Sequence, residues 1–166
     1  MEALKGRVGV VTGASSGIGA AVARACAEAG MAVVLGARRE AALTAVRDDI
    51  RASGGIADAV VTDLRDEHQV EALIAAAMAR HGRIDALVNN AAVGTLGTVA
   101  EGQTADWRAV LETNVLGTAV ACRAALRHML PRGQGDILTM TSASGREGWP
   151  YMALYSASKA ALHTFA

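Results

Sequence analysis

The sequence has few aromatic residues, few prolines, two cysteines and no excess of charge of either sign. Of the 166 residues, 3% are aromatic and two are proline, while 52% are hydrophobic, a composition that argues against intrinsic disorder. Lys and Arg number 16, as do Asp and Glu, which argues against a basic nucleic-acid binder and against a polyacidic tail. Cys26 and Cys122 are too few for a disulfide framework, so we expect buried, reduced thiols in a cytoplasmic protein.

Signals for a membrane segment, a secretory leader and a metal site are also missing. No uninterrupted apolar run approaches the roughly 18 residues that a membrane-spanning helix needs. The first apolar run is short and follows Glu2, Lys5 and Arg7, a pattern unlike that of a signal peptide. The four histidines have no metal-ligand spacing, so no metal is expected. The length suits one domain over residues 1–166, with no membrane or nucleic-acid partner.

Short apolar runs alternate with longer stretches of helical composition. Strands are expected at residues 8–12, 32–36, 57–62, 84–89 and 137–140. Helices are expected at residues 17–29, 40–52, 66–80, 104–130 (with a break near Thr113 and Asn114) and from 151 to the end. Strands that are apolar throughout are buried on both faces, which is typical of parallel sheets covered by helices. The alternation therefore predicts an α/β fold, a Rossmann-like doubly wound parallel sheet.

The loop after the first strand has the composition of a phosphate-binding turn. Glycines at positions 13, 17 and 19 allow a tight turn and a close approach of ligand to backbone, and a helix N-terminus follows. The loop also contains Ser15, Ser16 and Ile18. A tight turn from strand to helix needs glycine in any case, so the motif gains specificity from its place between a strand and a helix. We expect a pyrophosphate here.

The loop after the second strand indicates which nicotinamide cofactor the chain prefers. In dinucleotide folds an acid at this place binds the adenine ribose hydroxyls, whereas an arginine accommodates a 2′-phosphate. Here Arg38 and Arg39 follow the strand, and the first acid is Glu40, in the next helix. Guanidinium groups bind phosphate through charge-assisted hydrogen bonds. NADP(H) is therefore favoured over NAD(H), the alternative being that both arginines are solvated loop charges.

Polar residues also follow the later strands. Asp63, Asn90 and Ser142 stand at carboxyl ends of predicted strands, where ligands bind in open α/β sheets. Each of them alone is also explained as a turn residue with satisfied hydrogen bonds. Tyr155 and Lys159 are four residues apart and share one face of the last predicted helix. An ammonium nearby favours the phenolate form of a tyrosine, a usable acid/base, although such a pair is also common on an ordinary helix surface.

Together these motifs resemble the short-chain dehydrogenase/reductase family in its common cytosolic form. The resemblance covers the whole chain and includes the motifs Thr12-Gly13-x-x-x-Gly17-x-Gly19 and Tyr155-x-x-x-Lys159. It implies that Tyr155 exchanges a proton with the substrate oxygen, which Ser142 holds by hydrogen bonding. It further implies that Lys159 binds the nicotinamide ribose and tunes Tyr155, and that Asn114 holds a water linking Lys159 to solvent.

The resemblance also implies a cofactor site along the strand ends. Asp63 is expected to bind the adenine amine, and Asn90 to lie along a cofactor ribose. The full set of expected cofactor-binding residues is Gly13, Ser15, Ser16, Gly17, Ile18, Gly19, Arg38, Arg39, Asp63, Leu64, Asn90, Ala91, Tyr155 and Lys159. For a chain completed as in the family, the resemblance also implies that the helices containing Asn114 and Tyr155 pair with their counterparts in a two-fold homo-oligomer.

The sequence departs from the family pattern at two places. Asn-Asn-Ala-Gly is replaced by a motif ending in Ala92; if this position needs an unusual backbone angle, alanine costs about 1 kcal/mol. Family members also continue beyond the Tyr155 helix with further strands and a substrate-covering segment. We therefore expect residues 137–140 to form an exposed sheet edge, the substrate pocket to be largely missing, and this chain to lack measurable activity.

Three readings of the function remain open on the sequence. The first is an NADP(H)-dependent oxidoreductase acting on a small-molecule carbonyl or alcohol. The second is a truncated, non-catalytic chain that at most binds NADP(H) or associates with a full-length relative. The third is a generic nucleotide-binding module with an incidental Tyr–Lys pair, which leaves Ser142 and Asn114 unexplained.

Overall fold

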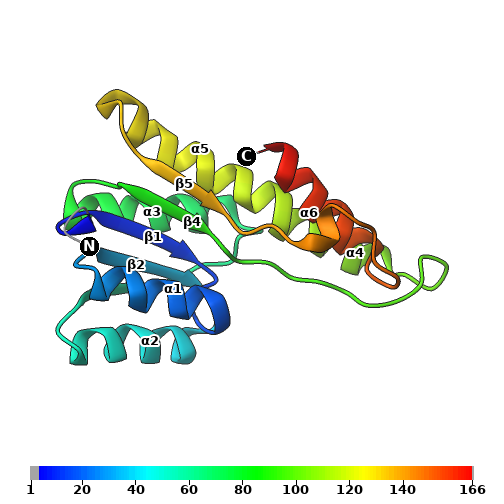
Figure 1. Cartoon of the computed structure of the whole chain (residues 1–166), viewed down its shortest axis with the longest axis horizontal. Coiled ribbons are helices and arrows are strands. Elements are labelled where there is room, and N and C mark those ends of the chain that lie inside the picture. The colour runs from blue at the N-terminus through cyan, green and yellow to red at the C-terminus, as the bar shows by residue number, and fades with distance from the viewer. Residues whose placement is uncertain (1–3, 166) are drawn as a thin grey trace.

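The computed structural model describes residues 4–165, and its centre is a five-stranded parallel sheet (Figure 1). The strand order is β3-β2-β1-β4-β5, with every neighbouring pair parallel. The strands are β1 (Val8–Thr12), β2 (Ala32–Ala37), β3 (Ile56–Val61), β4 (Ala86–Asn89) and β5 (Asp136–Thr139). This arrangement confirms the predicted doubly wound fold, whose order changes direction beside β1.

Helices cover both faces of the sheet and separate two hydrophobic cores (Figure 1). On one face lie α1 (Gly17–Glu28) and α2 (Glu40–Ala52), and on the other lie α3 (Glu67–His81) and α5 (Thr118–Met129). Every residue of β1 and β2 is buried. Because successive strand side chains point to opposite faces, Val10 packs in the α3/α5 core and Val11 in the α1/α2 core.

The predicted break near Thr113 and Asn114 is wrong. Residues Thr104–Arg132 form one helix of 29 residues. It comprises α4 (Thr104–Leu111), a π-helical turn η2 (Glu112–Gly117), α5 and the short 3₁₀ turn η3 (Leu130–Arg132). The chain widens into a π turn instead of breaking, and such turns are frequent at functional sites.

This long helix is also apolar enough, by length and composition, to cross a membrane, which the sequence had not indicated. More than half of its most apolar window, 56%, is buried inside the fold. Val120, Ala121 and Ala125 belong to the core shared with α3 and the sheet. Burial within the protein therefore accounts for its apolar character.

The remaining elements surround the end of β5. A 3₁₀ turn η4 (Ala143–Gly145) and the last helix α6 (Ala153–Phe165) follow it, and α6 lies beside the long helix (Figure 1). In the described sheet β5 is an edge strand, and Ile137 and Leu138 are exposed, as predicted. Among residues 4–165, Tyr151 (φ 64°) is the one non-glycine residue with a positive φ. Ala92 therefore has an ordinary backbone angle and carries no backbone strain.

A buried carboxylate, Asp85, links several segments at the end of the sheet opposite the carboxyl ends of the strands. It accepts a hydrogen bond from Val8 N at 2.8 Å and pairs with Arg83 and Arg132 at 2.6 and 2.7 Å. Burial opposes ionisation, but the two guanidinium groups and the backbone N–H outweigh it and lower the pKa of Asp85 to about 2.

Candidate active site

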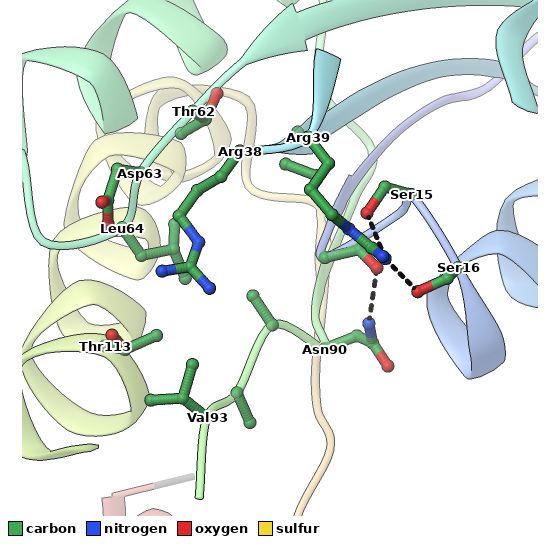
Figure 2. A pocket seen from close by; sticks show the side chains of 15 residues that line it. Ser15, Ser16, Arg38, Arg39, Thr62, Asp63, Leu64, Asn90, Val93 and Thr113 are labelled. Carbon is green, nitrogen blue, oxygen red and sulfur yellow. Dashed lines mark hydrogen bonds between the residues drawn. The ribbon is translucent and has the colours of Figure 1, made fainter. Parts of the chain in front are cut away.

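A cavity of about 330 Å³ lies at the carboxyl ends of the central strands. Loops after β1, β2, β3 and β4 supply its walls, together with Thr113 of the π turn (Figure 2). The lining residues are Gly13, Ser15, Ser16, Gly36, Ala37, Arg38, Arg39, Thr62, Asp63, Leu64, Asn90, Ala91, Ala92, Val93 and Thr113. Nine of the residues predicted to bind cofactor therefore line one cavity, because parallel strands end at the same edge of the sheet.

The glycine-rich loop is shaped for a ligand at the start of α1. Gly17 has φ +55° and open space where a side chain would stand. Gly19 is packed so tightly that a Cβ would lie 2.4 Å from the Gly13 carbonyl oxygen. The Ser16 side chain does not cap the helix, and the first turn contains no acid. Backbone N–H groups and the positive end of the helix dipole are thus presented toward the cavity end, an arrangement that fits a pyrophosphate.

Gly17, Ile18 and Gly19 do not themselves line the cavity. They form the first turn of α1, next to Ser15 and Ser16, which do line it. The Ile18 side chain is 61% exposed although it is apolar. Gly17, Ile18 and Gly19, which were predicted to bind cofactor, therefore lie beside the cavity and not in its walls.

Asn90 and Thr12 fasten the glycine-rich loop to the end of β4. The Asn90 Nδ2 group donates to the carbonyl oxygens of Thr12 and Gly13 at 3.0 and 3.3 Å. The Thr12 Oγ1 atom accepts from the backbone N–H groups of Asn90 and Ala91 at 3.1 and 3.2 Å. Asn90 thus lines the cavity, and its amide donors support the loop; the sequence did not show this role or that of Thr12.

Arg38 and Arg39 both face the cavity from the end of β2 (Figure 2). The Arg39 guanidinium donates to Ser15 Oγ at 3.2 Å and to Ser16 Oγ at 2.5 Å, which links the β2 loop to the glycine-rich loop. The Arg38 guanidinium points into the cavity, on the side of Asp63 and Leu64. The Arg39 guanidinium and two serine hydroxyls therefore lie on one side of the cavity, and the Arg38 guanidinium lies on the side of Asp63 and Leu64. Guanidinium and hydroxyl groups are donors that suit a phosphate.

Asp63 faces an unexpected partner. Arg65 Nε and Nη2 donate to its carboxylate at 3.1 and 2.6 Å, and the Arg65 backbone N–H donates at 3.0 Å. These hydrogen bonds from Arg65 outweigh the effect of burial and lower the pKa of Asp63. Asp63 lines the cavity as predicted, but its carboxylate already has a cationic partner, which the sequence analysis missed.

Asn114 is fully buried in the π turn and joins two separate segments. Its Oδ1 atom accepts from Val93 N at 2.8 Å, and its Nδ2 group donates to Val93 O at 2.8 Å and to Ser158 Oγ at 2.9 Å. Val93 belongs to the loop after β4, and Ser158 belongs to α6. The amide therefore fixes α6 relative to the cavity wall.

Lys159 and Tyr155 share one face of α6, as their spacing predicts. The Lys159 Nζ atom lies 5.8 Å from the centre of the Tyr155 ring and donates to Met140 O at 2.6 Å. Lys159 is 3% exposed, and this burial lowers the pKa of its ammonium group. The buried Lys159 side chain thus lies beside the half-buried Tyr155 ring.

Ser142 stands between β5 and the turn η4. Its Oγ atom accepts from Ser144 N at 3.2 Å and lies 2.9 Å from Ser144 Oγ. The Ser142 carbonyl oxygen lies 3.2 Å from the Nε2 atom of His163 on α6. The four residues expected to be catalytic thus gather around α6, and Val93 and Thr113 connect this group with the cavity.

No group of three or more His, Cys, Asp or Glu side chains that could hold a metal ion occurs among residues 4–165. The described cysteines, Cys26 and Cys122, are free, and burial raises the pKa of both thiols.

Comparison with known proteins assigns the chain to a family. The short chain dehydrogenase model matches residues 7–166. A 3-oxoacyl-[acyl-carrier-protein] reductase from a Synechocystis species is 39% identical over 99% of this chain and 67% of its own length. A short chain dehydrogenase/reductase from Burkholderia phymatum, solved with NAD, is 37% identical with a TM-score of 0.96, over 99% of this chain and 59% of that one.

A metagenomic short-chain oxidoreductase solved with NADP has a TM-score of 0.94 at 39% identity, over 98% of this chain and 74% of that one. The chain thus spans from 59% to 74% of the length of these three relatives. A family model that matches nearly every residue agrees with the parallel sheet, the glycine-rich loop and the Tyr155–Lys159 helix. The chain belongs to the short-chain dehydrogenase family of oxidoreductases.

Proposed function

We propose that the protein is an NADP(H)-dependent oxidoreductase that acts on a small-molecule carbonyl or alcohol, with Tyr155 as its acid/base. The observation that carries this proposal is the buried ammonium of Lys159, 5.8 Å from the Tyr155 ring. Neither residue lines the cavity, but Asn114 bonds both to Ser158 of their helix and to Val93 of the cavity wall. Burial of a cation costs free energy, so a buried ammonium is not expected for an incidental Tyr–Lys pair on a helix surface.

The preference for NADP(H) over NAD(H) is supported by the end of β2. Arg38 and Arg39 face the cavity there, and Ser15 and Ser16 add hydroxyl groups beside Arg39. Solved relatives contain NAD in one case and NADP in another, so this preference is argued from the charges in this chain. Two guanidinium groups favour the cofactor with the additional phosphate.

When bound, the nicotinamide supplies or accepts the hydride. In reduction, the Tyr155 hydroxyl donates its proton to the substrate oxygen, and in oxidation the phenolate takes the proton back. The Lys159 ammonium stabilises that phenolate and binds the cofactor ribose, while Ser142 holds the substrate oxygen. The water relay from Asn114 stays a prediction; its hydrogen bonds to Val93 and Ser158 support a positioning role as well.

The test compares Tyr155→Phe with Tyr151→Phe, a matched loss of one phenol hydroxyl from an exposed tyrosine at the start of the same segment. Because the 166-residue chain is expected to lack measurable activity, both variants are made in a chain extended to the length of its relatives. NADPH absorbance is followed with a panel of ketones and aldehydes, and NADPH binding is measured by fluorescence. We expect Tyr155→Phe to abolish turnover with binding nearly unchanged, and Tyr151→Phe to retain both. Substantial turnover by Tyr155→Phe would remove Tyr155 from the acid/base role.

A second candidate is a chain that binds NADP(H) without turnover. The exposed edge of β5 favours it, because Ile137 and Leu138 are 36% and 52% exposed just before Ser142. An unpaired strand holds the residues that follow it less firmly. Saturable NADPH binding by the wild-type chain with no turnover on any substrate of the panel would support this candidate over the first.

We also propose a cytoplasmic homo-oligomer, in which the helices containing Asn114 and Tyr155 meet their counterparts. An apolar groove of about 460 Å³ between α5 and the end of α6 supports this arrangement; it includes Cys122, Leu126, Leu130 and Phe165. Leu130 and Phe165 are 71% and 51% exposed in the single chain. Light scattering at micromolar concentration tests the assembly, and a monodisperse monomer would contradict it.

A further inference from the structure

The hydroxyl of Ser144 lies beside that of Ser142 and is far less accessible. Ser144 is 2% exposed, and its Oγ atom is 2.9 Å from Ser142 Oγ. The Ser144 backbone N–H donates to the same Ser142 oxygen at 3.2 Å. Ser144 therefore contacts Ser142 through both its side chain and its backbone.

These two contacts determine which way the Ser142 hydroxyl points. A hydroxyl has one proton to donate and two lone pairs to accept with. Among the described residues, Ser142 Oγ is the hydrogen-bond partner of the buried Ser144 hydroxyl. A buried hydroxyl proton that lacks an acceptor is unfavourable. Ser144 Oγ therefore donates to Ser142 Oγ, whose second lone pair is taken by the Ser144 N–H.

We propose that Ser144 is a positioning residue that makes Ser142 a dedicated hydrogen-bond donor. With both lone pairs occupied, the Ser142 hydroxyl directs its own proton away from Ser144, toward the oxygen of the substrate. A donor fixed in advance stabilises the negative charge that develops on that oxygen in the transition state. This role rests on the proposed oxidoreductase function, whereas the orientation of the two hydroxyls does not.

The turn that carries both serines is held in place by contacts other than this hydrogen bond. His163 Nε2 lies 3.2 Å from Ser142 O. Gly145 is packed directly on the α6 backbone, where a Cβ would lie 2.7 Å from the carbonyl carbon of Lys159. Replacing Ser144 with alanine therefore removes one buried hydroxyl while the turn stays docked on α6.

Neutron diffraction from crystals of the deuterated chain tests the orientation directly and needs no turnover. We expect the Ser144 deuteron to lie between the two Oγ atoms and the Ser142 deuteron to point away from Ser144. A Ser142 deuteron lying between the two oxygens would overturn the proposal. This result is obtained whether or not the wild-type chain proves to be an oxidoreductase.

Kinetics test the consequence. We expect Ser144→Ala to lower kcat about tenfold while the Kd for NADPH changes less than about twofold, because the lost interaction acts in the transition state. Ser144→Cys retains a weaker donor and should restore part of kcat. The matched control is Ser156→Ala, since Ser156, on α6, is also buried and its hydroxyl has no hydrogen-bond partner among residues 4–165.

Thermal unfolding of each variant shows whether the fold is kept. A Ser144→Ala variant that unfolds like wild type and turns over as fast as Ser156→Ala would overturn the proposal. Absence of turnover in the wild-type chain extended to the length of its relatives would instead refute the proposed oxidoreductase function, and the neutron result would still decide how the two hydroxyls are oriented.

Discussion

Replacing Arg38 with alanine should weaken the binding of NADPH much more than that of NADH. The Arg38 guanidinium points into the cavity from the end of β2, and within residues 4–165 it forms no hydrogen bond or ion pair (Figure 2). It is therefore free to bind a phosphate without first breaking a bond within the protein. Arg39 already donates to Ser15 and Ser16, so its phosphate contact replaces existing hydrogen bonds.

The size of the effect follows from the kind of bond that is lost. A charge-assisted hydrogen bond to a phosphate contributes roughly 1.5–3 kcal/mol. Arg38→Ala should accordingly raise the Kd of NADPH about 10- to 150-fold. NADH lacks the 2′-phosphate, so its Kd should change by less than about threefold. We expect a smaller loss for Arg39→Ala, because the two serine hydroxyls released by the substitution remain available to the phosphate.

Fluorescence titration of both cofactors against both variants measures these ratios. Arg24→Ala serves as a control, because Arg24 does not line the cavity and pairs instead with Asp49 of α2 at 2.7 Å. Raising the salt concentration should weaken NADPH binding more than NADH binding, since exposed charges are screened. An equal loss of affinity for the two cofactors in Arg38→Ala would refute the assignment of Arg38 to the 2′-phosphate.

Three further predictions concern the lysine, the buried carboxylate and the glycine-rich loop. Lys159→Ala should lower both turnover and NADPH affinity, measured as above, since Lys159 is proposed to bind the ribose and to stabilise the phenolate. The folded chain lowers the pKa of Asp85 from 3.8 to about 2, and this shift contributes about 2 kcal/mol to the free energy of unfolding above pH 3.8. That contribution is lost as the pH falls from 3.8 through 2. Urea unfolding at several pH values should show the loss in wild type and not in Asp85→Asn. Gly19→Ala should cost about 1–3 kcal/mol, because its Cβ would lie 2.4 Å from Gly13 O, whereas Gly97→Ala, which meets open space, should be nearly neutral in the same assay.

Local patterns were sufficient to predict the elements of the fold. The first strand and the second helix occur at the predicted residues, 8–12 and 40–52, because apolar runs, glycine turns and helix formers act over short distances. The predicted break at Thr113 and Asn114 failed for a physical reason. Their weak helix propensity is overcome by tertiary contacts, above all the hydrogen bonds of Asn114 to Val93, 21 residues away.

Side-chain partners within the site were harder to predict. The sequence placed Asp63 at a strand end and the resemblance implied a contact with the adenine amine, but neither showed that Arg65 would pair with the carboxylate. Similarly, Asn90 was expected beside a ribose, while its amide also supports the carbonyls of Thr12 and Gly13. Sequence spacing places residues at a strand end, but the rotamer chosen there depends on neighbours that only the folded chain brings close.

The two halves of the candidate site are built from different parts of the molecule, and Asn114 bonds to both. The phosphate-binding half belongs to β1, β2 and α1, whereas Tyr155 and Lys159 are fixed to α6 and to the carbonyl of Met140. Asn114 contacts both halves, because Val93 is part of the cavity wall and Ser158 is part of α6. A displacement of α6 by an ångström would separate the phenol from a nicotinamide held at the other end, and misplacement of that size costs about 100-fold in rate. Under the proposed function, the buried amide in the π turn would help to keep Tyr155 in register with the cofactor, independently of any water it holds.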